Sequence, residues 1–469
     1  MFKIFESRVS YIVALFSCLL LSGCNSGGTA PPKATENVEA QQREVSERLL
    51  ESAVDMLNRL DDYDEGQIES AVGQVVRRLN ESFAAGVLDA EQSEPFELED
   101  GKTLRELVWL REAGEYAVGD ETDPLARAQR LADWTVRNIQ LIPADAPAAE
   151  RLPYLPWHIM LLGRGTEFDR AWLFSLLARQ QGLDVVLITP GEDTAQVVPA
   201  LLHDGRLVPF DIVSGLPDER RDFAGKVVFD SSSNFISKRF ERLERQLTGD
   251  SKLVLSLDIA DLTAKLKKCP GVKEVVARPI RDERFAASRE KAAFDALVEQ
   301  LKPFRAPPIE GGSRMTTSPL WRARVRHITG KYVFAEGGGI PLTRLYQEAR
   351  PAESELVELR SNSDIWTYAY RIKQNATYWL GLLSYDLQNY ETAVQYLELV
   401  LKDKANGGWT AGARYNLGRT YEAWGKPDEA IKTYRATFLD LPPDAACLMR
   451  AERLEKVAKP LRNSRKTAF

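Results

Sequence analysis

The sequence predicts an α+β protein of several domains, with all-helical segments at both ends and a region of mixed helices and strands between them. Apolar residues recur every three or four positions between Val45 and Leu79, which is the spacing of one face of a helix. A capped helix, a buried strand and a hairpin follow one another between Thr166 and Asp211. Towards the C-terminus, a pattern of glycine, alanine and aromatic residues occurs twice, as in helical repeats.

The chain begins with the features of a secretory signal. Lys3 and Arg8 precede a largely apolar run at residues 11–21, which is too short to span a bilayer as a stable helix. The sequence Leu-Ser-Gly-Cys that ends at Cys24 resembles the lipobox of bacterial lipoproteins. This resemblance implies that residues 1–23 are a signal peptide and that Cys24 carries lipid. An ordinary cleaved signal with an incidental cysteine is the alternative.

Lipid on Cys24 implies a protein anchored to a membrane of the cell envelope. Each buried methylene adds about 0.8 kcal/mol of membrane affinity, so several acyl chains hold a protein firmly. Asn25 is not acidic, and by the same resemblance this favours the outer membrane over the inner one. Residues 24–42 are rich in Gly, Pro, Ala and polar side chains without an apolar face, which predicts a flexible tether.

Composition argues against two classes of protein. With 62 basic and 68 acidic residues the net charge is −6, whereas a nucleic-acid surface needs a basic excess. The mean hydropathy is −0.30, and no later segment reaches about eighteen consecutive apolar residues. We therefore expect no nucleic-acid partner and no transmembrane helix after the signal.

The inventory of metal ligands and thiols is small. The chain has three histidines and four cysteines, and only Cys269 and Cys447 lie outside the predicted signal and lipid site. Their spacing fits no CxxC or HExxH pattern, so we expect no metal site and no cofactor. We predict two separate buried thiols, with a disulfide as the alternative.

Residues 43–115 are predicted to form a helical segment. One apolar stripe runs from Val45 through Leu49 to Leu60. A second stripe runs from Ile68 to Leu79 after an acidic turn, so the two stripes predict a helical hairpin.

Residues 116–250 carry the mixed pattern. A helix is predicted over 125–139, and a second helix is predicted to begin after Thr166, which forms a capping box with Asp169. This second helix should stop at Gly182, because a residue without Cβ adopts the left-handed conformation readily. Residues 184–188 predict a buried strand, and the Asp-Gly pair that follows His203 predicts a hairpin turn.

This order of elements, with the sequence FDRAWLFSLLARQQGLDVVLI, resembles the core of the transglutaminase-like (papain-like) superfamily. The resemblance implies a nucleophilic cysteine at the start of the helix, a histidine base on the next strand and an orienting aspartate on the strand after it. In this chain Glu167, Gln196 and Asp211 occupy these positions. A carboxylate cannot replace a thiolate in acyl transfer, and a glutamine does not titrate near neutral pH. We therefore expect a catalytically degenerate domain that is not an enzyme.

The same residues have plain structural explanations. The helix dipole favours Glu167 in a first turn whatever the function, and Asp211 is suited to capping a strand end. Nevertheless, a cleft that has lost its nucleophile can keep its shape. Four side chains are candidates to line a groove for a peptide or glycan: Arg164, Glu167, Gln196 and Asp211.

Residues 251–335 are predicted to be an α/β region of unknown type. Residues 253–257 have the composition of a strand, and 261–268 and 292–301 that of helices. The Pro- and Gly-rich stretch 303–319 predicts a connector. No catalytic or binding motif is predicted in this region.

Residues 361–460 contain the repeated pattern. Gly418 follows Gly381 by 37 residues, and an alanine follows each glycine by twelve, at Ala393 and Ala430. This pattern resembles tetratricopeptide repeats, in which small residues let paired helices approach closely. Residues 366–372 and 445–457 are predicted to supply an opening and a closing helix.

The resemblance implies that the inner face of the repeats binds an extended peptide or a partner helix. That face is predicted to carry Asn375, Tyr378, Tyr385, Asp386, Tyr415, Arg419 and Glu422. The alternative is that two repeats form a packing platform for the upstream domains of the same chain.

Three classes of function follow from these patterns. The first is a membrane-anchored envelope lipoprotein that acts in protein–protein interaction or envelope assembly, with peptidoglycan as a possible partner. The second is a peptidase- or amidase-like hydrolase that uses Glu167, Asp211 and His203. The third is a purely structural tether.

Overall fold

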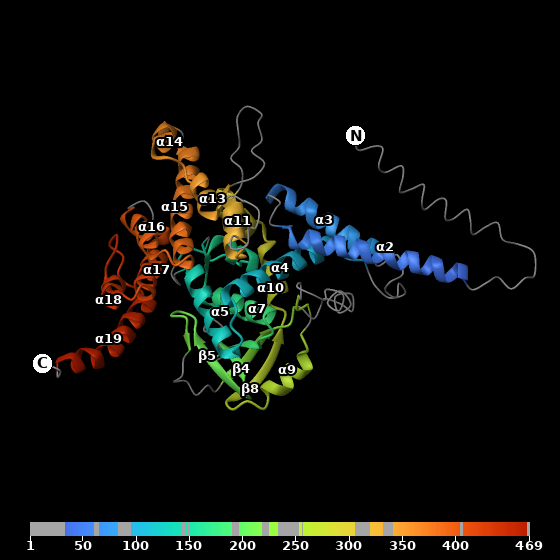
Figure 1. The fold of residues 1–469 in the computed structure, drawn as a ribbon, viewed down its shortest axis with the longest axis horizontal. Helices are drawn as coiled ribbons and strands as arrows, with labels where there is room; N and C mark the ends of the chain where they lie inside the picture. Colours follow the sequence, from blue (N-terminus) through green and yellow to red (C-terminus); the bar gives the residue numbers. More distant parts are fainter. Residues whose placement is uncertain are drawn as a thin grey trace, which may run out of the picture.

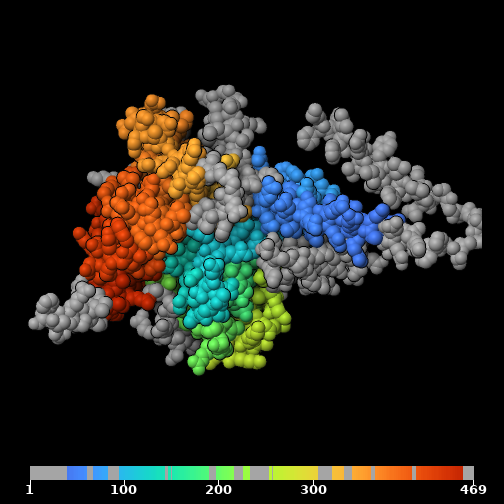
Figure 2. All heavy atoms as spheres, in the orientation of Figure 1, coloured from blue at the N-terminus to red at the C-terminus, as the bar shows by residue number. Residues whose placement is uncertain are grey.

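A computed structural model shows a six-stranded sheet flanked by helices, with a helical hairpin projecting on one side and a set of helical repeats on the other (Figure 1). Figure 2 shows the same arrangement as a filled surface. The structure describes these residues: 33–60, 65–82, 95–142, 146–148, 150–189, 197–217, 225–232, 253–255, 257–304, 319–331, 341–361, 363–403 and 407–466. Cys24 and Gln196 lie outside them.

The N-terminal hairpin consists of α2 (Lys33–Asn58) and α3 (Glu65–Ser82), as predicted. Leu57 and Val75 lie in its buried seam, and the hydroxyl of Ser46 donates to the carbonyl of Ser82 at 2.5 Å. The predicted tether differs, because α2 already begins within it. The stretch KATENVEAQQ is rich in strong helix formers and needs no apolar face to be helical. Among the described residues, no helix combines the length and apolar character needed to cross a membrane.

The central part follows the predicted order of helix, strand and hairpin. Its elements are α4 (Leu98–Val118), α5 (Pro124–Asn138), β1 (Gln140–Leu141), α6 (Pro156–Leu162), β2 (Arg164–Gly165), α7 (Glu167–Gln180), β3 (Val185–Thr189), β4 (Val198–His203), β5 (Arg206–Asp211), β6 (Leu216–Pro217), β7 (Gly225–Asp230), α9 (Ile259–Leu266) and β8 (Val272–Arg278).

The capping box predicts the start of α7 correctly. The amide of Asp169 donates to the hydroxyl of Thr166 at 3.2 Å, and the amide of Thr166 donates back to the Asp169 carboxylate at 2.8 Å. Gly182, with φ of 68°, ends the helix in the left-handed conformation. The turn between β4 and β5 has positive φ at both Asp204 and Gly205, which matches the right-handed twist of the two strands.

The sheet has the order β6-β5-β4-β3-β7-β8, antiparallel except for the parallel pair β7–β8. Strand β3 is buried along its whole length, because both faces of the sheet are covered. Leu187 packs in the core shared with α7, whereas Val186 packs in a second core with Leu262 of α9. The uninterrupted apolar sequence of β3 follows from this burial on two sides.

The structure corrects two expectations for residues 251–335. Strand β8 pairs with β7, so the boundary predicted at residue 250 divides one sheet. Residues 253–255 do not join a strand, although their sequence is strand-like. Val254 instead donates its amide to the Gln180 side chain at 3.1 Å and accepts from the same side chain at 2.9 Å.

A group of helices links the sheet to the repeats. These helices are α10 (Ile280–Ser288), α11 (Lys291–Leu301), η5 (Lys302–Phe304), α12 (Pro319–Ile328), α13 (Leu342–Ala349), α14 (Glu353–Glu358) and η6 (Leu359–Ser361).

The repeats comprise α15 (Ser363–Asp386), α16 (Tyr390–Lys402), η7 (Gly407–Trp409), α17 (Thr410–Ala423), α18 (Pro427–Arg435) and α19 (Ala445–Lys466). Residues 366–372 are the first part of α15 and not a separate opening helix. Gly381 and Gly418 lie where the helices of each pair meet. A Cβ on Gly381 would lie 2.8 Å from Leu397, and one on Gly418 would overlap the ring of Tyr434.

Candidate functional site

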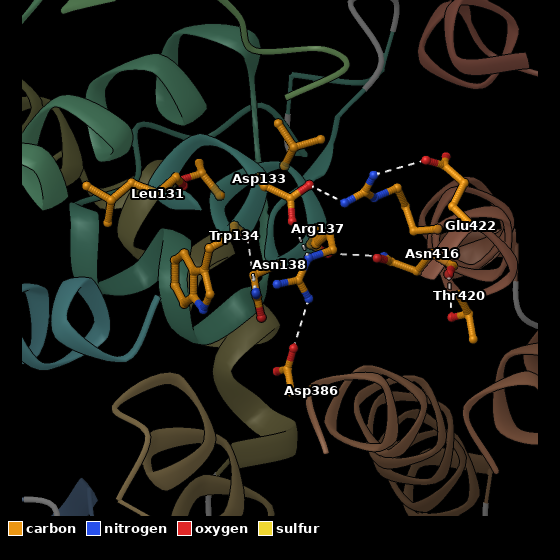
Figure 3. Close-up of polar contacts among 12 residues, drawn as sticks. Leu131, Asp133, Trp134, Arg137, Asn138, Asp386, Asn416, Thr420 and Glu422 are labelled. Carbon is orange, nitrogen blue, oxygen red and sulfur yellow. Dashed lines mark hydrogen bonds and ion pairs between the residues drawn. The ribbon is translucent and has the colours of Figure 1, made fainter. Parts of the chain in front are cut away.

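The inner helices of the repeats pack against α5 of the central domain (Figure 3). Arg137 of α5 donates to Asp386 at the end of α15 at 2.9 Å. Arg419 of α17 donates to Asp133, one turn earlier on α5, at 2.6 Å. Two ion pairs, one buried and one partly buried, therefore connect the repeats to the same helix.

Neutral hydrogen bonds extend this contact. Asn416 donates its amide to the carbonyl of Arg137 at 3.1 Å and to the hydroxyl of Tyr378 at 3.0 Å. The hydroxyl of Tyr415 donates to the carbonyl of Ser214 at 3.0 Å, in the turn that follows β5. The contact is thus made by residues of α15, α17, α5 and this turn.

Helix α19 completes the network from the other side. Arg450 donates to the carbonyl of Ser214 at 2.6 Å and to Glu422 at 3.2 Å. Glu422 also accepts from the hydroxyl of Tyr434 and, at 3.3 Å, from Arg419. Every charged side chain in this set therefore has a partner of opposite charge.

Electrostatics keep the two acids of the interface ionised. Burial alone would raise the pKa of Asp133, but three neighbouring guanidinium groups outweigh it and hold this pKa below its usual value. Burial also opposes ionisation of Asp386, and Arg137 and His327 lower its pKa in the same way. His327 Nε2 lies 3.2 Å from the Asp386 carboxylate, yet desolvation dominates and lowers the pKa of this histidine.

All seven residues predicted to form the partner-binding face make contacts within the chain. Tyr385 stacks beneath the Arg137 guanidinium at 4.6 Å, and Asn375 accepts from Trp409 Nε1 at 2.7 Å. The other five take part in the contacts described above. Around Asp386 and Arg419 the inner face of the repeats therefore contacts the chain's own α5, whereas Asn375, Tyr378 and Tyr415 line the cavities described next.

A row of three adjoining cavities lies beside this contact, and we call it the interdomain cleft. The first cavity, of about 560 Å³, lies between the start of α7, β1, α15 and α17. A second, of about 410 Å³, shares Gln140 and Asp444 with the first. A third, of about 370 Å³, shares Arg164 and Glu150 with the second. The cleft thus adjoins the short β1–β2 pair, whose Gln140, Leu141 and Arg164 line it.

The first cavity lies at the position where the family resemblance implies a nucleophile. Glu167 lines it from the first turn of α7 and is exposed. Arg170 lines it one turn later and donates to three backbone carbonyls, of Val136, Ile139 and Ile212. Burial lowers the pKa of Arg170 to about 10, so this side chain remains a cation at neutral pH.

Asp211 does not line the interdomain cleft. Its carboxylate accepts from the amide of Val213 at 2.8 Å and from the hydroxyl of Ser214 at 2.7 Å, so it caps the end of β5. His203 lies at the hairpin turn, where its Nε2 is 3.5 Å from Asp204. Of the four residues predicted to line a groove, Arg164 and Glu167 line the cleft.

The two thiols are buried and separate, as predicted. Cys269 follows α9, and Cys447 lies in the first turn of α19, where burial and the Asp444 carboxylate raise its pKa. Neither thiol has a histidine among its contacts in the described part of the chain. Within that same part, no three His, Cys, Asp or Glu residues are grouped as metal ligands.

Two residues of α5 and one of α19 were missed by the sequence analysis: Asp133, Arg137 and Arg450. The first two are four positions apart, a spacing that also occurs in solvent-exposed helical ion pairs. Their acceptors and donors in the repeats lie more than two hundred positions away. The helical spacing predicts a shared face but gives no sign of what covers it.

Comparison with known proteins supports one part of this fold. Residues 375–402 and 411–436 match the family model described as Tetratricopeptide repeat. No curated protein and no solved structure matches the chain. The matched segments cover the helix pairs α15–α16 and α17–α18, and such repeats are typical of protein–protein interaction. The chain therefore carries two tetratricopeptide repeats within residues 375–436.

Proposed function

We propose that this protein is a lipid-anchored lipoprotein of the cell envelope that binds a partner protein in the interdomain cleft and has no catalytic activity. The observation that carries the proposal is the position of the cleft. Tyr378 and Tyr415 of the repeats line it, while α5 contacts the neighbouring part of the same helices at Asp386 and Arg419. A partner segment can therefore contact the repeats here without displacing these ion pairs.

The surroundings of the cleft support binding more than catalysis. The first cavity offers aromatic and apolar walls from Phe168, Val213 and Tyr415, and charged side chains such as Glu167 and Arg170 lie between them. The resemblance to the transglutaminase-like core implies a degenerate version of that domain, with Glu167 at the nucleophile position. Anchoring through Cys24 remains part of the proposal and is supported by the lipobox-like sequence.

Filling the cleft tests the binding proposal. Ala411 lines both the first and the second cavity, so Ala411→Trp should obstruct them. Ala423 lies on the same helix and is exposed, so Ala423→Trp is a matched control. Partners cross-linked to the full-length protein in detergent-solubilised envelopes are quantified by mass spectrometry. We expect the control to retain the partner and Ala411→Trp to lose it; equal capture by both variants would exclude the cleft.

Membrane anchoring is tested separately. Cys24→Ala should move the protein from the detergent phase to the aqueous phase in a phase-partition experiment, because the acyl chains are lost. Partition unchanged by this substitution would contradict lipidation of Cys24.

One observation favours hydrolysis as a second candidate function. Glu167 and Asp444 both line the first cavity, and hydrolases of peptides or glycans use paired carboxylates. Turnover of peptidoglycan fragments that is lost in both Glu167→Gln and Asp444→Asn would support it. No turnover by the unmodified protein would remove this candidate.

A further inference from the structure

Arg164 is a largely buried cation without a counter-ion among the described residues. Its Nη2 donates to the carbonyl of Gly408 at 2.5 Å, and its guanidinium lies over the ring of Trp409 at 4.7 Å. The Nε of the same side chain is buried and has no hydrogen-bond partner within the described ranges. Of its five N–H donors, this part of the structure therefore gives an acceptor to one.

The other buried arginines near the cleft are held differently. Arg170 donates to three carbonyls. Arg414 donates to two, at Leu441 and Pro442, although its Nε, like that of Arg164, is buried without a partner among the described residues. These two side chains complete the ends of helices and turns. Arg164 has a single carbonyl among the described residues, although a buried charge needs several compensating groups.

Arg164 is also placed where a ligand can reach it. It lines the second and the third cavity of the interdomain cleft, so open space lies on two sides of it. Burial lowers the pKa of Arg164, and the like charge of Arg371 at the rim of the third cavity acts in the same direction, whereas Tyr154, Glu150 and Tyr378 act in the opposite one. Among the described residues, Glu150 is the one acid that lines the third cavity; its charge raises the pKa of Arg164, but the two side chains form no direct ion pair.

We propose that Arg164 anchors a carboxylate-binding subsite at the junction of the second and third cavities. A carboxylate accepts two hydrogen bonds in one plane, which suits the unused donors of a guanidinium, and Trp409 and Phe304 supply apolar walls for the rest of the ligand. The subsite does not depend on the proposed protein partner. The carboxylate is either free, as in a small organic acid, or part of a peptide, and the experiment separates these sources.

The test uses the full-length lipidated protein in detergent and isothermal titration calorimetry. The probes are propionate, acetyl-Ala-Ala-Ala with a free C-terminus, its C-terminal amide, and acetyl-Ala-Glu-Ala-amide with its Gln counterpart. We expect at least one carboxylate probe to bind, with its uncharged counterpart weaker by about tenfold or more. Binding of propionate alone would indicate a small organic acid as the ligand. Binding of acetyl-Ala-Ala-Ala would indicate the C-terminus of a peptide, and binding of acetyl-Ala-Glu-Ala-amide would indicate an acidic side chain. No binding by any carboxylate, or equal binding by the amides, would overturn the proposal.

Variants separate a ligand-binding role from a structural one. Arg164→Met should abolish carboxylate binding and leave the urea midpoint of the free protein unchanged or higher, because an uncompensated buried charge is removed. Arg170→Met is the matched control, and it should lower the midpoint because three carbonyls lose their donor. A midpoint lowered by Arg164→Met as much as by Arg170→Met would mean that Arg164 is structural and would refute the subsite.

Substitutions at the rim of the third cavity test the proposal even if the Arg164→Met variant does not fold. Glu150→Gln removes a repelling charge and should strengthen carboxylate binding, whereas Arg371→Gln should weaken it, each by a few-fold. Both side chains are exposed, so neither substitution should disturb the fold. The opposite sign for either variant would contradict the proposal. If the unmodified protein binds no carboxylate but still captures its partner, this inference alone is refuted.

Discussion

Arg137 shows how much depends on single side chains at the contact between the repeats and the central domain. It is buried and donates to Asp133 on its own helix and to Asp386 in the repeats, both at 2.9 Å. Removing one member of a buried pair leaves the other charge without compensation, which costs far more than breaking an exposed pair.

We therefore expect Arg137→Met to reduce the free energy of unfolding by about 3–5 kcal/mol. Arg130 lies on the same helix, and its ion pair with Glu121 is half exposed, so Arg130→Met should cost about 1 kcal/mol. Urea unfolding monitored by tryptophan fluorescence measures both values. An equal loss of unfolding free energy in the two variants would show that burial does not make the Arg137 ion pairs more important for stability than the half-exposed Arg130 pair.

Two histidines, the buried His327 and the partly buried His158, make stability depend on pH. Burial lowers the pKa of His158 to about 3, and desolvation also lowers that of His327. His158 Nδ1 accepts from the amide of Leu155, which requires the neutral ring. Both groups bind a proton in the unfolded state near pH 6.5 but not in the folded state, so their contribution to stability is complete above that pH and is lost as the pH falls.

Below pH 6.5 each histidine should reduce stability by about 1.4 kcal/mol per pH unit, until its folded pKa is reached. His327→Gln should therefore lower the pH dependence of the urea midpoint between pH 6.5 and 5. The measurement compares midpoints at pH 7, 6 and 5 for both proteins. Identical slopes would mean that His327 is not titrating on unfolding.

Helix pairing within the repeats rests on two glycines. Gly418 has no room for a Cβ because the ring of Tyr434 occupies that space, whereas a Cβ added to Gly73 in α3 would have no described atom within 4 Å. Replacing glycine by alanine should therefore change stability in opposite directions at these two helical positions.

Gly418→Ala should lower the free energy of unfolding by about 1–3 kcal/mol through overpacking. Gly73→Ala should raise it by about 0.5–1 kcal/mol, because alanine loses less backbone entropy in a helix. Urea denaturation of the two variants tests this difference in sign. A stabilising Gly418→Ala would show that α17 and α18 can separate without cost.

Elements whose determinants are close in sequence could be predicted, and those set by distant partners could not. The Thr166–Asp169 box and the Asp204–Gly205 turn each lie within four residues, so the sequence predicts both. Residues 253–255 have strand-like composition but find their hydrogen bonds on Gln180, which no local pattern reveals. The parallel pairing of β8 with β7 is likewise a property of the tertiary fold.

The same limit applies to the candidate site. Glu167 and Arg164 were identified because a helix start and its preceding residues were visible in sequence. The cleft itself is formed by two segments that are more than two hundred positions apart, such as Gln140 and Gly412, whose amide donates to the Gln140 side chain at 2.9 Å. Periodicity shows which face of a helix is buried, but not the identity of its neighbour.

The repeats and the central domain are joined through this contact. Removing the repeats should therefore destabilise the central domain. Residues 1–361 without the repeats would leave Asp133 and Arg137 paired only with each other, without Arg419 and Asp386, and Ser214 without Tyr415. We expect this fragment to unfold at a lower urea concentration than the full chain, with a loss of several kcal/mol because each of the two charges loses its second partner. Comparing the two unfolding curves by circular dichroism tests this. Coincident curves for the sheet would show that the two parts fold independently.

Helix α2 gives the proposed lipid anchor a further property. It spans 26 residues from Lys33 and, at about 1.5 Å per residue, is about 39 Å long. A helix of this length separates two points by a fixed amount, whereas a coil of equal residue number varies widely in span. With lipid on Cys24 as proposed, the rigid length of α2 would contribute to the distance between the bilayer and the cleft. Shortening or lengthening α2 by whole turns would then change which layer of the envelope the protein can touch.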